Sequence, residues 1–143
     1  MGMREAYESG GTFGDVAAGQ RPHEFHSVAA LQPYRLLEGL AARAVHGERV
    51  TLAVVDLAPG LVMAAHRHVN EQVGIVVRGA MDFTVGGETR RRATGDMWVI
   101  PAGVPHDVRV GDEGCTVVEC FSPPRGDWDA LPRLDPAPGD WPL

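Results

Sequence analysis

Long hydrophobic runs and cysteines are scarce in this chain. No stretch approaches the roughly 18 consecutive apolar residues of a membrane helix, and the N-terminal residues lack the apolar core of a secretory signal. The two cysteines, Cys115 and Cys120, are an odd number of positions apart, which places them on opposite faces of an extended segment and disfavours a disulfide. We therefore expect reduced thiols, a cytoplasmic location and no membrane partner.

Basic residues are also few in this chain. The 13 Lys and Arg residues are outnumbered by 19 Asp and Glu, for a net charge of −6 with His neutral. Since nucleic-acid binding needs a basic face, nucleic acid is not an expected partner. The 143 residues, of which 44% are hydrophobic, are typical of one globular domain. The 18 Gly and 11 Pro exceed what a helical bundle tolerates.

The middle of the chain is a succession of short β-branched or alternating segments that end at Gly or Pro. Gly86-Gly87 is a two-residue hairpin signal between two of them. Segments of this length with turn residues every ~8–12 positions predict an all-β antiparallel sandwich or barrel. Residues 34–43 fit either a short helix or an edge strand. We expect strands at 50–57, 72–77, 80–85, 88–92, 96–100, 106–110 and 115–121.

The two ends of the chain differ from this middle part. Residues 1–33 are rich in Gly and polar groups and predict a loosely held N-terminal arm, whereas 34–125 form the predicted domain. Residues 126–143 form a tail dense in Pro and Asp. Trp128, Leu131 and Trp141 are too apolar for a solvated tail, so we expect them to pack against the body or a second subunit.

Three histidines are candidates for chemistry. His66 and His68 are two positions apart, and side chains at this spacing share one face of an extended segment. Gln72 is an even number of positions from both and is expected on the same face, whereas Glu71 is expected on the opposite face. His106 lies in a later segment. A barrel that joins these segments would surround one point with three imidazoles and an amide oxygen, which suit Fe, Ni, Zn, Mn, Co or Cu. The alternative is an exposed polar pair on a strand edge.

Two motifs around these histidines resemble those of the cupin superfamily. The first is Gly60-x5-His66-x-His68-x3-Gln72-x6-Gly79, and the second is Gly95-x5-Pro101-x-Gly103-x2-His106. Gln72 stands where the family usually has Glu, and Val110 where it usually has Asn. The resemblance implies a cupin jelly-roll β-barrel with an N-terminal arm and a Pro/Trp-rich tail. It also implies that one divalent transition metal is bound by His66, His68, Gln72 and His106.

A narrower resemblance covers the run His-x-His-x-x-Glu-Gln and the later Phe-Ser-Pro-x-Arg-x-x-Trp. Both are similar to small cupins of the pectin-degradation type, which linearise 4,5-unsaturated uronates to the keto form. That resemblance implies catalytic roles for Glu119, Phe121 and Arg125, with Glu in place of the family's Asp, and it supports a homodimer. The same C-terminal pattern occurs in many small cupins, and some related cupins act in polyketide tailoring.

The residues themselves leave alternatives for this second set. Glu119 and Phe121 share a face of the last strand. If that face is inward, Glu119 is suited to general acid/base work; if it is outward, Glu119 is an ordinary solvated edge residue. Arg125, held by two preceding prolines, would either dock a substrate carboxylate or pair with Asp127 or Asp129.

The donor set favours one class of chemistry. Three imidazoles and an amide are all neutral, so a divalent ion keeps its full charge and acts as a strong Lewis acid. This predicts a metal-dependent isomerase, lyase or cyclase. Its reaction would be isomerisation, ring opening, tautomerisation or cyclisation of a small oxygenated, acidic molecule such as an unsaturated uronate or a polyketide. The alternatives are an Fe or Cu dioxygenase of the quercetinase type and a non-catalytic cupin that binds a small ligand.

Overall fold

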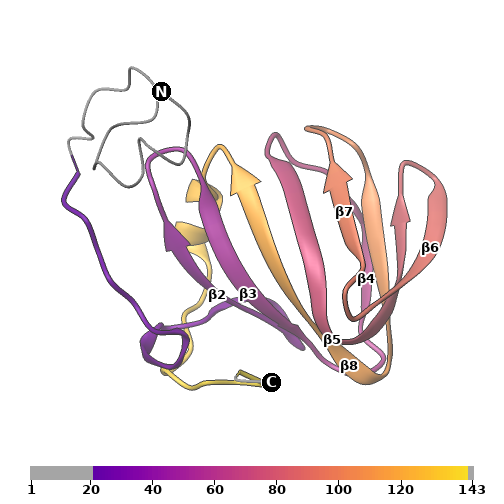
Figure 1. Ribbon diagram of the computed structural model, residues 1–143, viewed down its shortest axis with the longest axis horizontal. Coiled ribbons are helices and arrows are strands. Elements are labelled where there is room, and N and C mark those ends of the chain that lie inside the picture. Colours follow the sequence, from indigo (N-terminus) through magenta and orange to yellow (C-terminus); the bar gives the residue numbers. More distant parts are fainter. Residues whose placement is uncertain (1–20, 142–143) are drawn as a thin grey trace, which may run out of the picture.

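The computed structural model describes residues 21–141, and nearly all regular structure within this range is β-strand (Figure 1). No helix in the described range is long and apolar enough to span a membrane. Residues 1–20 of the predicted arm lie outside the described residues. The elements are η1 (Val28–Ala30), β1 (Tyr34–Leu37), β2 (Leu40–His46), β3 (Thr51–Leu57), β4 (Val62–His66), β5 (Glu71–Val85), β6 (Glu88–Ala93), β7 (Met97–Ile100), β8 (His106–Ser122) and η2 (Gly126–Ala130).

Two long bent strands, β5 and β8, connect the two sheets of the barrel (Figure 1). Residues 71–76 of β5 pair with 117–122 of β8, in a sheet completed by β7 on one side and by β3, β2 and β1 on the other. Beyond the bend, residues 81–85 pair with 106–110, in a sheet completed by β6 and β4. All pairings are antiparallel, which confirms the predicted all-β jelly roll.

The bend explains why the sequence predicts four short strands where the chain forms two long ones. Gly79 and Gly114 meet there with φ angles of 75° and 78°, a region that disfavours other residues. A Cβ on Gly79 would also collide with the Gly114 carbonyl. These glycines bend each strand without ending it. Residues 34–43, left undecided by their pattern, form a hairpin of β1 and β2.

One row of residues that are paired with one another across neighbouring strands explains how the interior accommodates a carboxylate. The row runs Ala44, Ala53, Glu119, Gly74 and Trp98 across five strands. Its small members leave space beside Glu119, and the Trp98 indole lies over Gly74, where a Cβ would come within 2.5 Å of a ring carbon. The small residues of this row therefore leave room for the larger inward side chains.

The C-terminal tail packs against the barrel, as its apolar residues predict. Trp128 is only 2% exposed, and Leu131 packs against the core. The buried Arg43 pairs with Asp56 at 2.9 Å and donates from Nε to the Ala137 carbonyl. These contacts hold the tail over β2 and β3. The cysteines at 115 and 120 are both free thiols.

Candidate metal centre

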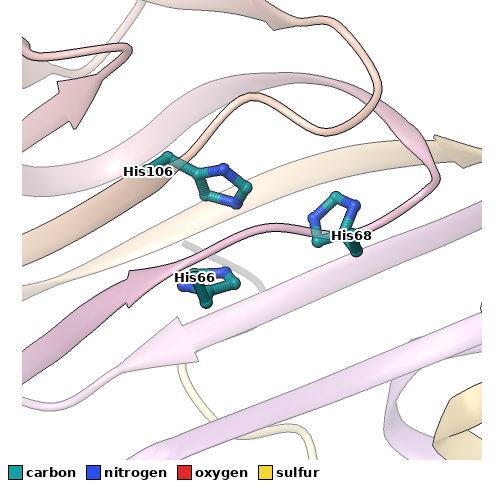
Figure 2. Close-up of side chains that lie close together, drawn as sticks. All are labelled: His66, His68 and His106. Carbon is teal, nitrogen blue, oxygen red and sulfur yellow. The ribbon is translucent and has the colours of Figure 1, made fainter.

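The three predicted histidines converge in the barrel interior, as Figure 2 shows. His66 ends β4 directly opposite His106, the first residue of β8, and His68 lies in the loop that leads to β5. The ring centroids are 4.2 Å apart for His66 and His106, 5.1 Å for His68 and His106, and 6.0 Å for His66 and His68. One nitrogen from each ring lies within 4.8 Å of the others. This spacing brings all three rings within reach of one ion.

Backbone carbonyls fix the orientation of all three imidazoles. A carbonyl only accepts hydrogen bonds, so the Nδ1 atom that faces it carries the proton. Each Nε2 is then left with a lone pair, which is the form a metal ligand requires. The Nδ1–carbonyl pairs are His66 with Ala64 at 3.1 Å, His68 with Asn70 at 3.0 Å, and His106 with Val104 at 2.9 Å.

Two of these lone pairs lack a hydrogen-bond donor among the described residues. His106 is 2% exposed, and its Nε2 is buried without a hydrogen-bond partner there. The Nε2 of His68 faces the Gln72 side-chain oxygen at 3.1 Å, so two acceptors oppose one another once Nδ1 carries the proton. A cation between these atoms would satisfy all of them. The donor set therefore fits a divalent transition metal.

Gln72 is the predicted fourth donor, and its neighbours hold its amide in place. It lies in β5 between Phe121 and Ile100 in register and is 5% exposed. Its Nε2 donates to a Glu119 carboxylate oxygen at 2.8 Å. Because the amide nitrogen is committed to Glu119, the amide oxygen points to His68 and the centre of the cluster.

Burial favours the neutral form of the His68 and His106 imidazoles. It lowers the pKa of His106 to about 4, although the hydrogen bond to Val104 opposes the shift. Burial also lowers the pKa of His68, and the positive charge of Arg125 adds to this effect. Neutral rings bind a metal without first having to lose a proton.

The cluster opens into a cavity of about 440 Å³ whose other walls are mainly apolar. Met63, Met81 and Phe83 line it. Met97 does not, because it lies on the outer side of β7 and is 67% exposed. This volume is within the range of small-molecule sites.

Glu119 faces this cavity and not the solvent. Burial raises the pKa of Glu119 to about 7, while the Gln72 hydrogen bond and the Arg125 charge oppose the shift. A bound divalent ion would also oppose this rise in the pKa of Glu119. The carboxyl group is therefore placed to exchange a proton with a molecule in the cavity.

Phe121 and Arg125 form another part of the cavity wall. The Phe121 ring packs edge-on against His68 at a centroid distance of 5.8 Å. The Arg125 guanidinium lies 4.8 Å from the centroids of both Phe121 and Trp128. Its Nε and Nη2 donate to the Asp127 carboxylate at 3.0 and 2.9 Å. Of the two predicted roles for Arg125, the ion pair with Asp127 is the one formed in this structure.

Sequence reasoning missed a hydrogen-bond chain behind Arg125. The Arg125 amide donates to Thr51 Oγ1 at 2.9 Å, and Thr51 Oγ1 lies 2.8 Å from His46 Nδ1. His46 Nε2 in turn lies 2.9 Å from the Tyr34 hydroxyl. This chain holds the backbone of Arg125 against the barrel. No local pattern marks it, because its members come from three distant segments.

The chain also matches known proteins. Residues 53–121 match the family described as "Cupin domain". Over 78 residues the chain is 30% identical to the pectin degradation protein KdgF of Dickeya dadantii (strain 3937), a match that covers 54% of this chain and 71% of that protein. The chain belongs to the cupin superfamily. The cupin resemblance predicted from the two motifs is thereby confirmed.

Solved structures give the same result for this cupin. The structure of KdgF from Halomonas sp. has a TM-score of 0.68 at 27% identity and covers 74% of this chain and 98% of that one. An RmlC-like cupin from Shewanella frigidimarina NCIMB 400 has a TM-score of 0.69 at 22% identity, with 77% and 99% covered, and it supports the fold alone. This protein is thus a small cupin similar to KdgF.

Proposed function

We propose that this cupin is a metal-dependent isomerase, lyase or cyclase. His66, His68, Gln72 and His106 would hold one divalent ion, which is Fe, Ni, Zn, Mn, Co or Cu. The observation that carries the proposal is the Nε2 of His106, which is buried without a hydrogen-bond partner among residues 21–141 and lies beside two further imidazoles in a ligand-sized cavity. The substrate is a small oxygenated, acidic molecule that undergoes isomerisation, ring opening, tautomerisation or cyclisation.

The neighbouring side chains would divide the remaining work. An ion bound by neutral donors supplies Lewis acidity, which polarises a carbonyl and stabilises an enolate. Glu119, 2.8 Å from Gln72, would take up and return the proton that moves during tautomerisation. Phe121 would hold the substrate against the cluster, and Arg125 would place a positive charge beside it.

Two substrate classes have support. The similarity to pectin degradation proteins favours an unsaturated uronate. The C-terminal pattern is similar to that of many small cupins of unknown activity, and because some related cupins act in polyketide tailoring, it also supports a polyketone. Composition adds two further predictions, a cytoplasmic location with reduced thiols and no nucleic-acid partner at a net charge of −6.

Assays of metal-loaded protein under nitrogen and in air test the proposal. We expect turnover of a 4,5-unsaturated uronate or of a cyclisable polyketone at the same rate in both atmospheres, because Lewis-acid isomerisation consumes no oxygen. Turnover coupled to oxygen uptake would instead support the dioxygenase hypothesis. Tight stoichiometric binding without conversion would support a ligand-binding cupin.

The Gln72→Glu variant tests the role of ligand charge. A carboxylate would neutralise part of the charge of the ion, so we expect tighter metal binding and slower turnover. It would also face Glu119 across a contact that is now 2.8 Å long, so the metal-free variant should be less stable than the wild type. Competition with a metallochromic chelator and steady-state rates measure the first two effects. The matched control is Glu71→Gln at the neighbouring exposed position. Unchanged turnover in Gln72→Glu would refute the charge argument.

We also propose a homodimer formed through the outer face of the sheet that contains β7. Across this sheet, Leu52, Cys120, Val73 and Val99 form one register row. Val73 is 37% exposed, Met97 67% and Val99 64%, so the face is apolar and accessible. Burial of such a face against a second copy is favourable.

Light scattering at micromolar concentration tests this dimer. The wild type is expected to have the mass of two chains, and Met97→Asp combined with Val99→Asp is expected to have the mass of one. Val62→Asp, at a position 56% exposed on β4, is the matched control and should stay dimeric. A wild-type protein that is monomeric under these conditions would contradict the proposal.

A further inference from the structure

The walls of the metal-site cavity are poor in hydrogen-bonding groups. Apart from the four metal donors, the polar side chains of described residues that line it are Glu119, Arg125 and Asp127. The rest of the lining is hydrocarbon or aromatic and includes Leu36, Leu40, Val55, Leu57, Val117 and Trp128. Polar groups are therefore concentrated around the metal cluster and at the Arg125–Asp127 pair.

The charges in the cavity are also largely matched. Arg125 makes a two-point ion pair with Asp127, so its Nε and Nη2 are already engaged. Glu119 accepts the Gln72 amide and lies beside the cluster. An anionic oxygen that enters the cavity therefore has the ion as its principal partner, and the other end of the same molecule meets leucine and valine side chains.

A sugar acid matches these walls poorly. It carries hydroxyl groups on most ring carbons, and each hydroxyl buried against hydrocarbon without a partner costs about tenfold or more in affinity. A hydrocarbon or aromatic body gains affinity in the same place, because its burial removes apolar surface from water.

We propose that the substrate has a mainly hydrocarbon body, aliphatic or aromatic, and one enolisable dicarbonyl or hydroxy-ketone head that binds the ion. This inference rests on the proposed function, because the head requires the metal site. It selects the polyketone class over the uronate class. The specificity is set by apolar side chains from β1, β3 and β8 and by Trp128, which lies in η2.

Two ligands with the same head test this proposal. Acetylacetone and benzoylacetone both present a β-diketone enolate to a metal, but the second carries a phenyl group in place of a methyl group. Isothermal titration into nickel-loaded full-length protein is expected to show benzoylacetone binding about tenfold tighter or more, from the added apolar burial. Parallel titrations with free nickel remove any difference between the heads themselves. D-Galacturonate, a polyol acid, is expected to bind more weakly than either diketone.

A variant pair assigns the preference to the cavity wall. Leu36→Ser, on the edge strand β1, places a hydroxyl in the lining and is expected to reduce the preference for benzoylacetone several-fold. Leu134→Ser, at a position 37% exposed and outside this cavity, is the matched control and should leave the preference unchanged.

The possible failures are distinguishable. Equal affinities for the two diketones, or tighter binding of galacturonate than of benzoylacetone, would overturn the substrate inference while leaving the metal enzyme intact. Failure of the protein to bind nickel or any of the other candidate ions would overturn the proposed function and this inference with it.

Discussion

Replacement of His106 with alanine is expected to reduce affinity for the divalent ion by about 100-fold or more, because even outer partners of metal ligands contribute ~10–100-fold. His106 is the central member of the cluster, with ring centroids 4.2 Å from His66 and 5.1 Å from His68. Its Nε2 is buried and has no partner in the described part of the chain, so the metal is the interaction that the variant loses.

Thermal unfolding with and without metal measures this loss. A ligand at 100 times its Kd stabilises the folded wild type by about 2.7 kcal/mol, and this increment should fall to about 0.4 kcal/mol or less in His106→Ala at the same metal concentration. The matched control is His26→Ala, which removes an imidazole whose side chain is 39% exposed and outside the cluster. If His106→Ala keeps the full metal-induced rise in Tm, the histidine is not a ligand.

Replacement of Glu119 with glutamine is expected to slow turnover by about 100- to 10,000-fold, the usual contribution of a positioned general acid or base. The change preserves shape, and an amide oxygen at this position still accepts the hydrogen bond from Gln72. Metal affinity and Tm should therefore stay close to those of the wild type, whereas proton transfer is lost.

Steady-state rates together with metal content separate these effects. The matched control is Glu113→Gln, which removes a carboxylate from an exposed position near the bend of the same strand. Full activity in Glu119→Gln would show that its carboxyl group does not move a proton. Loss of bound metal in this variant would instead assign Glu119 a role in supporting Gln72.

The all-β fold was predictable because its signals are local. Alternating apolar residues and turn glycines mark most extended segments, and β3, β6 and β7 start and end within one residue of the predicted positions. The joining of 72–77 with 80–85 was not predictable, since the bend depends on a contact between Gly79 and Gly114 from different strands. A Gly at a bend and a Gly at a turn have the same local sequence signal.

The even spacing of His66, His68 and Gln72 predicts that they face one region, with Glu71 facing away, and the structure places these side chains in this way. Strand alternation alone does not explain this arrangement, because β4 ends at His66 and His68 reaches the cluster from a loop. Asn70, which has the same parity, turns away and donates to the Pro123 carbonyl. Alternation does not persist through a loop, so the convergence of these side chains depends on the tertiary fold.

The surroundings of the site could not be predicted from the local sequence pattern. The contact between Gln72 and Glu119 depends on the register of β5 against β8, which the sequence pattern does not specify. The apolar lining comes from several strands and from the turn at Trp128, so no single segment indicates its character. The proposed substrate class, unlike the fold, therefore rests on the assembled barrel.

X-ray absorption spectroscopy of the metal-loaded protein tests most directly whether His66, His68, His106 and Gln72 bind one ion. Our account predicts one ion per chain, with the multiple-scattering signature of three imidazoles and with oxygen donors, at distances of ~2.0–2.2 Å if the ion is zinc. A spectrum with fewer than three imidazoles, or with sulfur in the coordination shell, would contradict it.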